Sequence, residues 1–309
     1  MGGGPAGLCA ALYAKRGNLN TAIIDLSSLG GQPVNYLEIE NYLGFPVIEG
    51  WELAEKFEQH ADKFGIQKFT NEEIQSVDLT SEIKTVTTLK GIYRSKAIIL
   101  ATGAKSAKLG IKGEKEFLGR GVSYCAVCDG AFYKNKTVVV IGGGNAAVEE
   151  GMYLTKFASK VYIMHRRNEL RADKIVQKRA FENNKIEFIL DSIPLEILGE
   201  NGRVSKIRFK NVKTEEINEI EVQGVFPYIG FSPNTEFFNG QILQDENGFI
   251  RVDENMRTSE VGVCAAGDVR RTPLRQVITA VADGAVAGNA AVKYLEEVES
   301  LMKEGALST

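Results

Sequence analysis

The chain has 309 residues, 44% of them apolar and 25% charged, which is ordinary for a globular protein of about one to three domains. Its formal net charge of −3 gives no basic field that would attract nucleic acid. No apolar run approaches the ~20 residues of a membrane helix, and no signal peptide opens the sequence. Four cysteines are too few for a disulfide scaffold and fit a reducing cytoplasm best.

A glycine-rich turn opens the chain and is followed by a predicted helix over 8–14 and a predicted strand over 21–25. Such a turn lets the backbone approach a pyrophosphate, which the helix N-terminus attracts. The strand ends in Asp25, about 20 residues after the turn, where an acid accepts hydrogen bonds from a ribose. The predicted dinucleotide-binding residues here are Gly2, Gly4, Pro5, Ala6, Gly7 and Asp25.

The start of this first unit is unusual, because Met1 alone stands where a buried apolar strand of about five residues normally precedes the turn. Losing that strand would remove several buried side chains at ~1.5–3 kcal/mol each, against a typical domain stability of ~5–15 kcal/mol. We therefore expect that the N-terminal strand of the first Rossmann unit is missing from this sequence and that the functional chain is longer.

The loosely alternating stretch over 67–94 predicts an antiparallel excursion from a parallel sheet. An apolar strand over 97–100 follows and runs into the short turn Ala101-Thr102-Gly103.

A C-x-x-C pair, Cys125 and Cys128, comes next. A zinc site would need a second ligand pair. The remaining candidates are scattered at Cys9, His60, His165 and Cys264. We therefore predict no metal and read the pair as redox-active, because two such thiols can close a small ring and stabilise one thiolate.

Asp129 directly follows the pair. A carboxyl beside a dithiol can serve as proton donor and acceptor in the thiol step. The alternative is an N-cap for the segment that follows.

A second strand–turn–helix–strand unit has strands over 137–141 and 161–164 and a helix to about 156. Its turn contains Gly142, Gly144, Asn145 and Ala146. No acid ends its second strand; His165, Arg166, Arg167 and Arg171 stand there instead. Guanidinium groups bind phosphate bidentately, so this turn is predicted to bind NADPH through its 2′-phosphate and the first turn FAD. Solvated surface charges are the alternative explanation of these arginines.

The rest of the chain completes two nucleotide-binding domains. A β-rich excursion over 186–222 leads to a strand over 225–228, and a strand and turn over 261–268 precede a helix over 274–295. We predict an α/β fold with two Rossmann-like domains of parallel sheets, helices and antiparallel β excursions. The FAD-binding domain spans 1–107 and 240–309, and the NADPH-binding domain, with the C-x-x-C, is inserted at 108–239.

The run from Tyr124 to Phe132 (YCAVCDGAF) resembles the redox motif of low-molecular-weight bacterial thioredoxin reductases, as does its place just before the second glycine turn. Further matches in order and spacing are Gly30-Gly31-Gln32, Glu40-Asn41, Ala101-Thr102-Gly103, His165-Arg166-Arg167 with Arg171, and Gly267-Asp268 with Leu274-Arg275-Gln276. The resemblance covers essentially the whole chain.

The resemblance implies an NADPH-dependent, FAD-containing reductase of a protein disulfide, by family default thioredoxin, which forms a homodimer in the cytoplasm. It also implies that Cys128 lies nearer the flavin, and that the inner domain rotates about hinges near 105–113 and 231–240. The FAD contacts implied are Gly31, Gln32, Asn41, Thr102, Gly103, Gly267, Asp268, Arg275 and Gln276.

Two positions depart from the family pattern. Ala146 stands where an acidic or hydroxyl residue is more usual, and Asp25 is shorter than the usual glutamate. Alternative functions are a reductase of another disulfide carrier, either peroxiredoxin-linked or glutaredoxin-like, and a truncated, flavin-poor, non-enzymatic form. An oxygen-dependent dithiol oxidase is disfavoured by the arginines, and a ferredoxin–NADP reductase by the dithiol.

Overall fold

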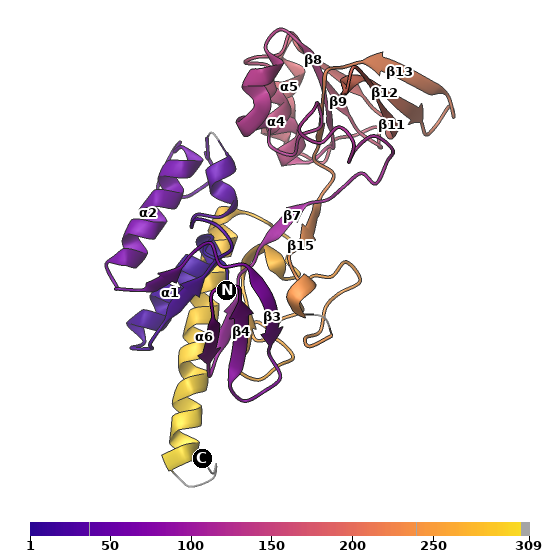
Figure 1. The fold of residues 1–309 in the computed structure, drawn as a ribbon. Coiled ribbons are helices and arrows are strands. Elements are labelled where there is room, and N and C mark those ends of the chain that lie inside the picture. The colour runs from indigo at the N-terminus through magenta and orange to yellow at the C-terminus, as the bar shows by residue number, and fades with distance from the viewer. Residues whose placement is uncertain (37, 239, 304–309) are drawn as a thin grey trace. The chain divides into compact units, whose positions relative to one another are not determined.

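The computed structural model describes residues 1–36, 38–238 and 240–303. The chain forms two compact units (Figure 1). The first comprises Met1–Lys105 and the segment from Ser232 onward, and the second is Ser106–Phe231. The chain passes between the units twice, where β7 (Ala104–Ser106) and β15 (Phe231–Pro233) form a two-stranded sheet.

The second unit is built on a four-stranded parallel sheet in the order β10-β9-β8-β14. Its strands are β8 (Thr137–Ile141), β9 (Lys160–Met164), β10 (Ile186–Ile189) and β14 (Gly224–Pro227). The strand order changes direction between β8 and β14, and nucleotides bind beyond the carboxyl ends of strands at such a switch point. Its helical elements are α3 (Ala126–Asp129), η2 (Gly130–Tyr133), α4 (Asn145–Leu154) and α5 (Lys174–Phe181).

An antiparallel sheet completes the second unit. It consists of β11 (Ser192–Glu200), β12 (Arg203–Asn211) and β13 (Ile217–Glu221). The prediction of an antiparallel excursion over 186–222 is therefore confirmed for these strands and wrong for β10, which extends the parallel sheet beside β9.

The parallel strands of the first unit form two pairs, β1 with β2 and β6 with β16. Their bounds are β1 (Ala22–Ile24), β2 (Gln67–Phe69), β6 (Ile98–Leu100) and β16 (Val263–Ala265). The backbone of Met1 and Gly2 connects the pairs: Gly2 N–H donates to Ile24 O at 2.8 Å, and Ala101 N–H donates to Met1 O at 2.8 Å. These two residues thus occupy the place in the sheet where a Rossmann unit normally has a central strand.

The other strands of the first unit, β3 (Ile74–Asp78), β4 (Lys84–Thr88) and β5 (Ile92–Ser95), form an antiparallel sheet. The predicted excursion over 67–94 is confirmed there and wrong for β2, which runs parallel to β1. The helical elements are α1 (Pro5–Arg16), η1 (Gln32–Asn35), α2 (Gly50–Asp62), η3 (Glu236–Phe238), η4 (Gly267–Val269) and α6 (Val277–Lys303).

Helices α1 and α6 pack closely because α6 has glycines at the contact. A Cβ on Gly284 would collide with the carbonyl of Ala6, and one on Gly288 would lie 2.6 Å from the carbonyl oxygen of Ala10. This contact fixes α1, and with it the first glycine turn, against α6.

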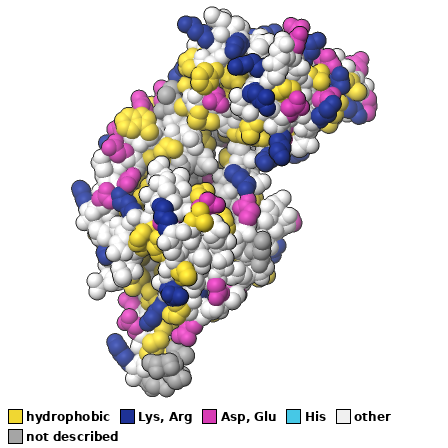
Figure 2. Space-filling model, in the orientation of Figure 1, with side chains coloured by type: hydrophobic (Ala, Val, Ile, Leu, Met, Phe, Trp, Pro, Cys, Tyr) yellow, Lys and Arg dark blue, Asp and Glu magenta, His cyan; other side chains and the backbone are white. Residues whose placement is uncertain are grey.

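In the described part of the chain, no helix is both long and apolar enough to cross a bilayer. Figure 2 shows basic and acidic side chains interspersed over the face in view.

Candidate functional site

The first glycine turn is tightly packed against its own backbone. Gly2 has φ of 96°, and a Cβ on Gly7 would collide with the carbonyl of Gly2. A Cβ on Gly31 would lie 2.7 Å from the Cα of Gly4. Helix α1 begins at Pro5, so its unpaired amide groups face this turn. The turn therefore offers a backbone cradle with a partial positive charge, which fits a pyrophosphate.

Asp25 is drawn into the same turn. One carboxylate oxygen accepts from Gly3 N–H at 2.5 Å, and the other accepts from Ser27 N–H at 2.8 Å. Oδ1 also accepts from the Ser27 hydroxyl at 3.1 Å, whereas Oδ2 accepts only from Gly3 among the described residues and keeps a second lone pair. Asp25 can thus hold the turn and still accept a hydrogen bond from a ribose hydroxyl.

Side chains distant in sequence also meet in the first unit. The Asn41 side chain donates to Gln276 Oε1 at 3.0 Å across 235 positions. Gln32 donates to Ala104 O at 3.1 Å. The structure thus brings Asn41 and Gln276 together, two residues that the family resemblance assigns to FAD.

The turn Thr102-Gly103 is fixed by a residue that we did not predict. Thr102 Oγ1 donates to Asn234 O at 2.7 Å, and Asn234 Nδ2 donates back to Thr102 O at 2.9 Å. Asn234 N–H also donates to Gly103 O at 3.0 Å.

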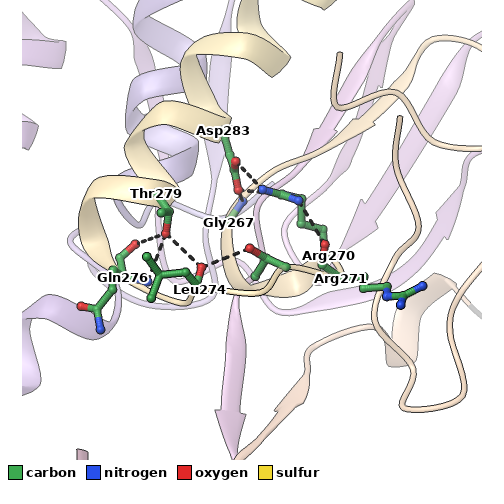
Figure 3. A network of polar contacts seen from close by, with 8 residues as sticks. Gly267, Arg270, Arg271, Leu274, Gln276, Thr279 and Asp283 are labelled. Carbon is green, nitrogen blue, oxygen red and sulfur yellow. Dashed lines mark hydrogen bonds and ion pairs between the residues drawn. The ribbon is translucent and has the colours of Figure 1, made fainter. Parts of the chain in front are cut away.

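A buried ion pair supports the turn Gly267-Asp268 (Figure 3). Asp283, on α6, accepts from Gly267 N–H at 3.1 Å and from Arg270 through Nε and Nη2, each at 2.6 Å. The sequence analysis missed Arg270 and Asp283, because no local motif marks a pair that forms only when α6 packs on the turn.

The pKa of Asp268 is raised above its usual value, chiefly by burial, while the nearby Arg275 opposes the rise. Arg275 itself lies over the ring of Phe249, with its guanidinium carbon 4.2 Å from the ring centre. Its Nε is buried and has no hydrogen-bond partner among the described residues. An unpaired buried donor beside a backbone cradle fits a bound polar cofactor, so the donor set of this unit suits FAD.

The second glycine turn follows the central strand β8. Gly142 has φ of 154° and its Cα faces the carbonyl of Tyr228, so that a Cβ there would collide with it. Gly144 precedes the first turn of α4, with open space where a Cβ would be. The carbonyl of Gly143 accepts from Arg171 N–H at 2.6 Å and from Ala172 N–H at 3.0 Å. The turn therefore presents the N-terminus of α4 at the switch point of the sheet.

His165 is buried and packs directly on this turn: a Cβ on Gly143 would lie 2.6 Å from three atoms of its ring. Burial lowers the pKa of His165 below its usual value, and the positive charges of Arg171, Arg167 and Arg166 lower it further. These arginines are exposed. The neutral ring thus belongs to the packing of the turn, and the arginines are left to meet an anion.

Asn145, the first residue of α4, is bound to the N-cap of α5. Its side chain donates to Asp173 Oδ2 and accepts from Asp173 N–H, both at 2.7 Å. The neighbouring Ala146 is half-buried and offers no polar group to a nucleotide.

Cys125 and Cys128 form a disulfide whose Cα atoms are 5.3 Å apart. Cys125 is the N-cap of α3, and its Sγ accepts from Cys128 N–H at 3.1 Å. Cys128 is the more exposed of the two. Cys9 and Cys264 are free thiols. A disulfide that includes an exposed cysteine is open to attack by a thiolate, and a thiolate formed at Cys125 would have an amide donor ready.

Asp129 ends α3 and is half-buried. Its side chain makes no capping hydrogen bond to the following η2, which removes the alternative reading of this residue as an N-cap. The pKa of Tyr133 is raised to about 12, mainly by burial and further by the charge of Asp129. The carboxyl of Asp129 therefore lies close enough to the buried hydroxyl of Tyr133 for its charge to act there.

Within the described residues, no three His, Cys, Asp or Glu side chains lie together as the ligands of a metal ion would.

The chain is similar to known proteins in both sequence and structure. The model of the pyridine nucleotide-disulphide oxidoreductase family matches residues 1–284. The chain is 47% identical to a thioredoxin reductase of Listeria innocua over 303 residues, which is 98% of this chain and 95% of that protein.

Solved structures agree with this result. The crystal structure of Lactococcus lactis thioredoxin reductase in its FR conformation has a TM-score of 0.93 and 44% identity, and covers 96% of this chain and 97% of that one. Thioredoxin reductase of Streptococcus pyogenes has 47% identity, and the match covers 96% of both chains, but its TM-score is 0.62.

Proposed function

The chain belongs to the pyridine nucleotide-disulphide oxidoreductase family, and we propose that it acts there as an NADPH-dependent, FAD-containing reductase of the thioredoxin disulfide. The observation that carries this proposal is the Cys125–Cys128 disulfide, in the same unit as the second glycine turn and the arginines that follow β9. Its relatives along nearly the whole chain are thioredoxin reductases.

The first unit would hold FAD on the turn from Gly2 to Gly7, with Asp25 at the ribose and Gly267-Asp268 nearby. The second unit would hold NADPH on the turn from Gly142 to Asn145. Bound FAD supplies the two-electron relay between NADPH and a disulfide.

Arg166, Arg167 and Arg171 would bind the 2′-phosphate of NADPH. Their exposure and their combined charge at His165 support this assignment, since a phosphate needs accessible guanidinium groups. The neutral His165 ring would support the turn at Gly143, whose carbonyl accepts from the amides of Arg171 and Ala172.

The chemical work of the chain itself lies at the dithiol. One thiolate of the Cys125/Cys128 pair attacks a sulfur of the partner disulfide and forms a mixed disulfide. The second thiol of the pair then displaces the partner, which leaves with two thiols, and the Cys125–Cys128 disulfide is restored. Asp129 would take up and return the proton that these steps exchange.

The catalytic cycle would include a rotation of the second unit against the first. The dithiol and the arginines belong to the same unit, and the chain passes between the units only by β7 and β15 in the described residues. The unequal TM-scores of two relatives of similar identity are what a family of two units with variable orientation would give. Locking the units by an engineered disulfide should leave one half-reaction and abolish turnover.

We also propose a cytoplasmic homodimer. Two free thiols fit a reducing compartment. Light scattering of the purified protein tests the dimer, and a mass of one chain would exclude it.

The test of the main proposal is NADPH oxidation by the yellow, purified protein with a thioredoxin as acceptor, and with a glutaredoxin-like protein in parallel. Cys125→Ser and Cys128→Ser should each abolish turnover, while the control Cys9→Ala should keep it. A colourless protein that takes up no flavin, or cysteine variants with full turnover, would refute the proposal.

A further inference from the structure

The redox segment is anchored on one side by a buried carboxylate. Glu114 accepts from the hydroxyl of Tyr124 at 2.6 Å and from the amides of Leu109 and Gly110 at 2.7 and 2.8 Å. Glu114 is 5% exposed. The residue immediately before Cys125 is therefore held by a carboxylate that is itself fixed by two backbone donors.

On the other side the anchor is Tyr228. Its hydroxyl accepts from the backbone N–H of Ala126 at 3.0 Å. Ala126 is fully buried and opens α3, between the two cysteines. This amide would otherwise be one of the unpaired donors of a helix start, with no access to water.

The backbone of Tyr228 lies at the second glycine turn. Tyr228 directly follows β14, and its N–H donates to Ile141 O at 2.7 Å. Its carbonyl packs on Gly142, the first glycine of the turn. β8 and β14 are the two strands at the switch point of the sheet, so Tyr228 stands at the edge of the predicted nucleotide crevice.

We propose that Tyr228 is a positioning residue that couples the nucleotide-binding turn to the redox disulfide: its backbone packs on Gly142 while its hydroxyl fixes Ala126 between Cys125 and Cys128. This inference rests on the proposed function only in taking the second turn as the NADP(H) site. The coupling runs inside one unit.

The hydroxyl should favour the disulfide over the dithiol. With α3 held, the two sulfurs stay close after reduction and re-form their bond readily; with α3 loosened, their effective concentration falls. The equilibrium is disulfide plus two glutathione giving dithiol plus glutathione disulfide, so two electrons and two protons pass to the Cys125/Cys128 pair.

The test is Tyr228→Phe, which removes only the hydroxyl. The holoenzyme is equilibrated in glutathione buffers, alkylated, and its dithiol fraction measured by mass. We expect the equilibrium constant to shift toward the dithiol by about threefold to tenfold, the size of one neutral hydrogen bond. The control is Tyr162→Phe on the adjacent strand β9, whose ring lies by Lys160, and it should match the wild type.

Saturating NADP⁺ supplies the second measurement. Bound NADP⁺ should shift the disulfide–dithiol equilibrium of the wild type. It should leave that of Tyr228→Phe unchanged, because this variant lacks the hydrogen bond that links the Gly142 turn to α3. A Tyr228→Phe protein that melts earlier but keeps the wild-type equilibrium would show a merely structural role and overturn the proposal. A wild-type equilibrium indifferent to NADP⁺ would overturn the coupling. The titration uses neither thioredoxin nor turnover, so its outcome is separate from that of the proposed function.

Discussion

Arg270 and Asp283 form a two-point ion pair beneath the Gly267-Asp268 turn, with Nε and Nη2 each 2.6 Å from a different carboxylate oxygen (Figure 3). Both side chains are largely buried. One oxygen of Asp283 also accepts from Gly267 N–H, so a single carboxylate fixes the turn to α6.

Asp283→Ala should therefore destabilise the protein by ~3–5 kcal/mol, because it leaves a buried guanidinium and a buried amide unpaired. Urea denaturation followed by fluorescence gives the free energy of unfolding, and flavin release at high dilution reports the turn itself. Glu182→Gln removes an exposed pair with Lys178 on α5 and serves as control, with an expected loss below ~0.5 kcal/mol. Equal losses in the two variants would contradict the importance of the buried pair.

The elements that the sequence predicts well are those with a local signal. Both glycine turns lie where the sequence predicts them, and the strands β8 and β9 coincide with the predicted apolar, β-branched segments. The disulfide joins the two cysteines spaced as C-x-x-C. Each of these depends on residues a few positions apart, so pattern alone suffices.

The direction of strand pairing has no such local signal. β2 and β10 stand at the start of stretches that read as antiparallel, yet both pair in parallel with a preceding strand. Alternation of apolar and polar residues indicates which face of a strand is buried. It does not indicate which strand pairs with it or in which direction. The contacts of Asp283 with Arg270 and of Asn41 with Gln276 were likewise out of reach, since they arise only from packing.

The pairing of Gly143 with His165 gives a test by double substitution. Gly143→Ala places a methyl group 2.6 Å from the imidazole ring and should lower the melting temperature and the affinity for NADPH. His165→Ala vacates that space, so the double variant should be more stable than Gly143→Ala alone. Gly144→Ala has open space at its Cβ and should melt like the wild type. Additive losses in the double variant would exclude the steric explanation.

The arginines after β9 should decide between NADPH and NADH. Replacing both Arg166 and Arg167 by Gln should reduce kcat/KM for NADPH by about ten- to a hundredfold through KM, since charge-assisted hydrogen bonds to a phosphate are lost. kcat/KM for NADH should stay nearly constant, because NADH lacks the 2′-phosphate. The double variant Lys178→Gln/Arg179→Gln, at two exposed positions of α5, provides a control of the same charge change. An equal loss with both coenzymes would mean that the two arginines act through the overall positive potential of the unit and do not contact the 2′-phosphate.

Glu150, on α4, should make stability fall as pH rises. It is 6% exposed, its Oε2 has no hydrogen-bond partner in the described residues, and its pKa is raised to about 8, first by burial and then by the charge of Glu149. In the unfolded chain the pKa returns to its usual value near 4.5. Between these values the folded state holds a proton that the unfolded state releases, so the stabilising effect of protonation is complete at low pH and is lost progressively up to about pH 8.

Glu150→Gln keeps the shape of the protonated carboxyl without its titration. Its melting temperature should equal that of the wild type near pH 4 and exceed it by on the order of 5 °C near pH 9. The comparison uses the difference between the two proteins, because other groups of the chain also titrate as the pH changes. Glu182→Gln changes an exposed residue directly after α5 and should follow the wild type at every pH. Parallel melting curves for Glu150→Gln and wild type across this range would mean that Glu150 ionises in the folded protein as it does in water.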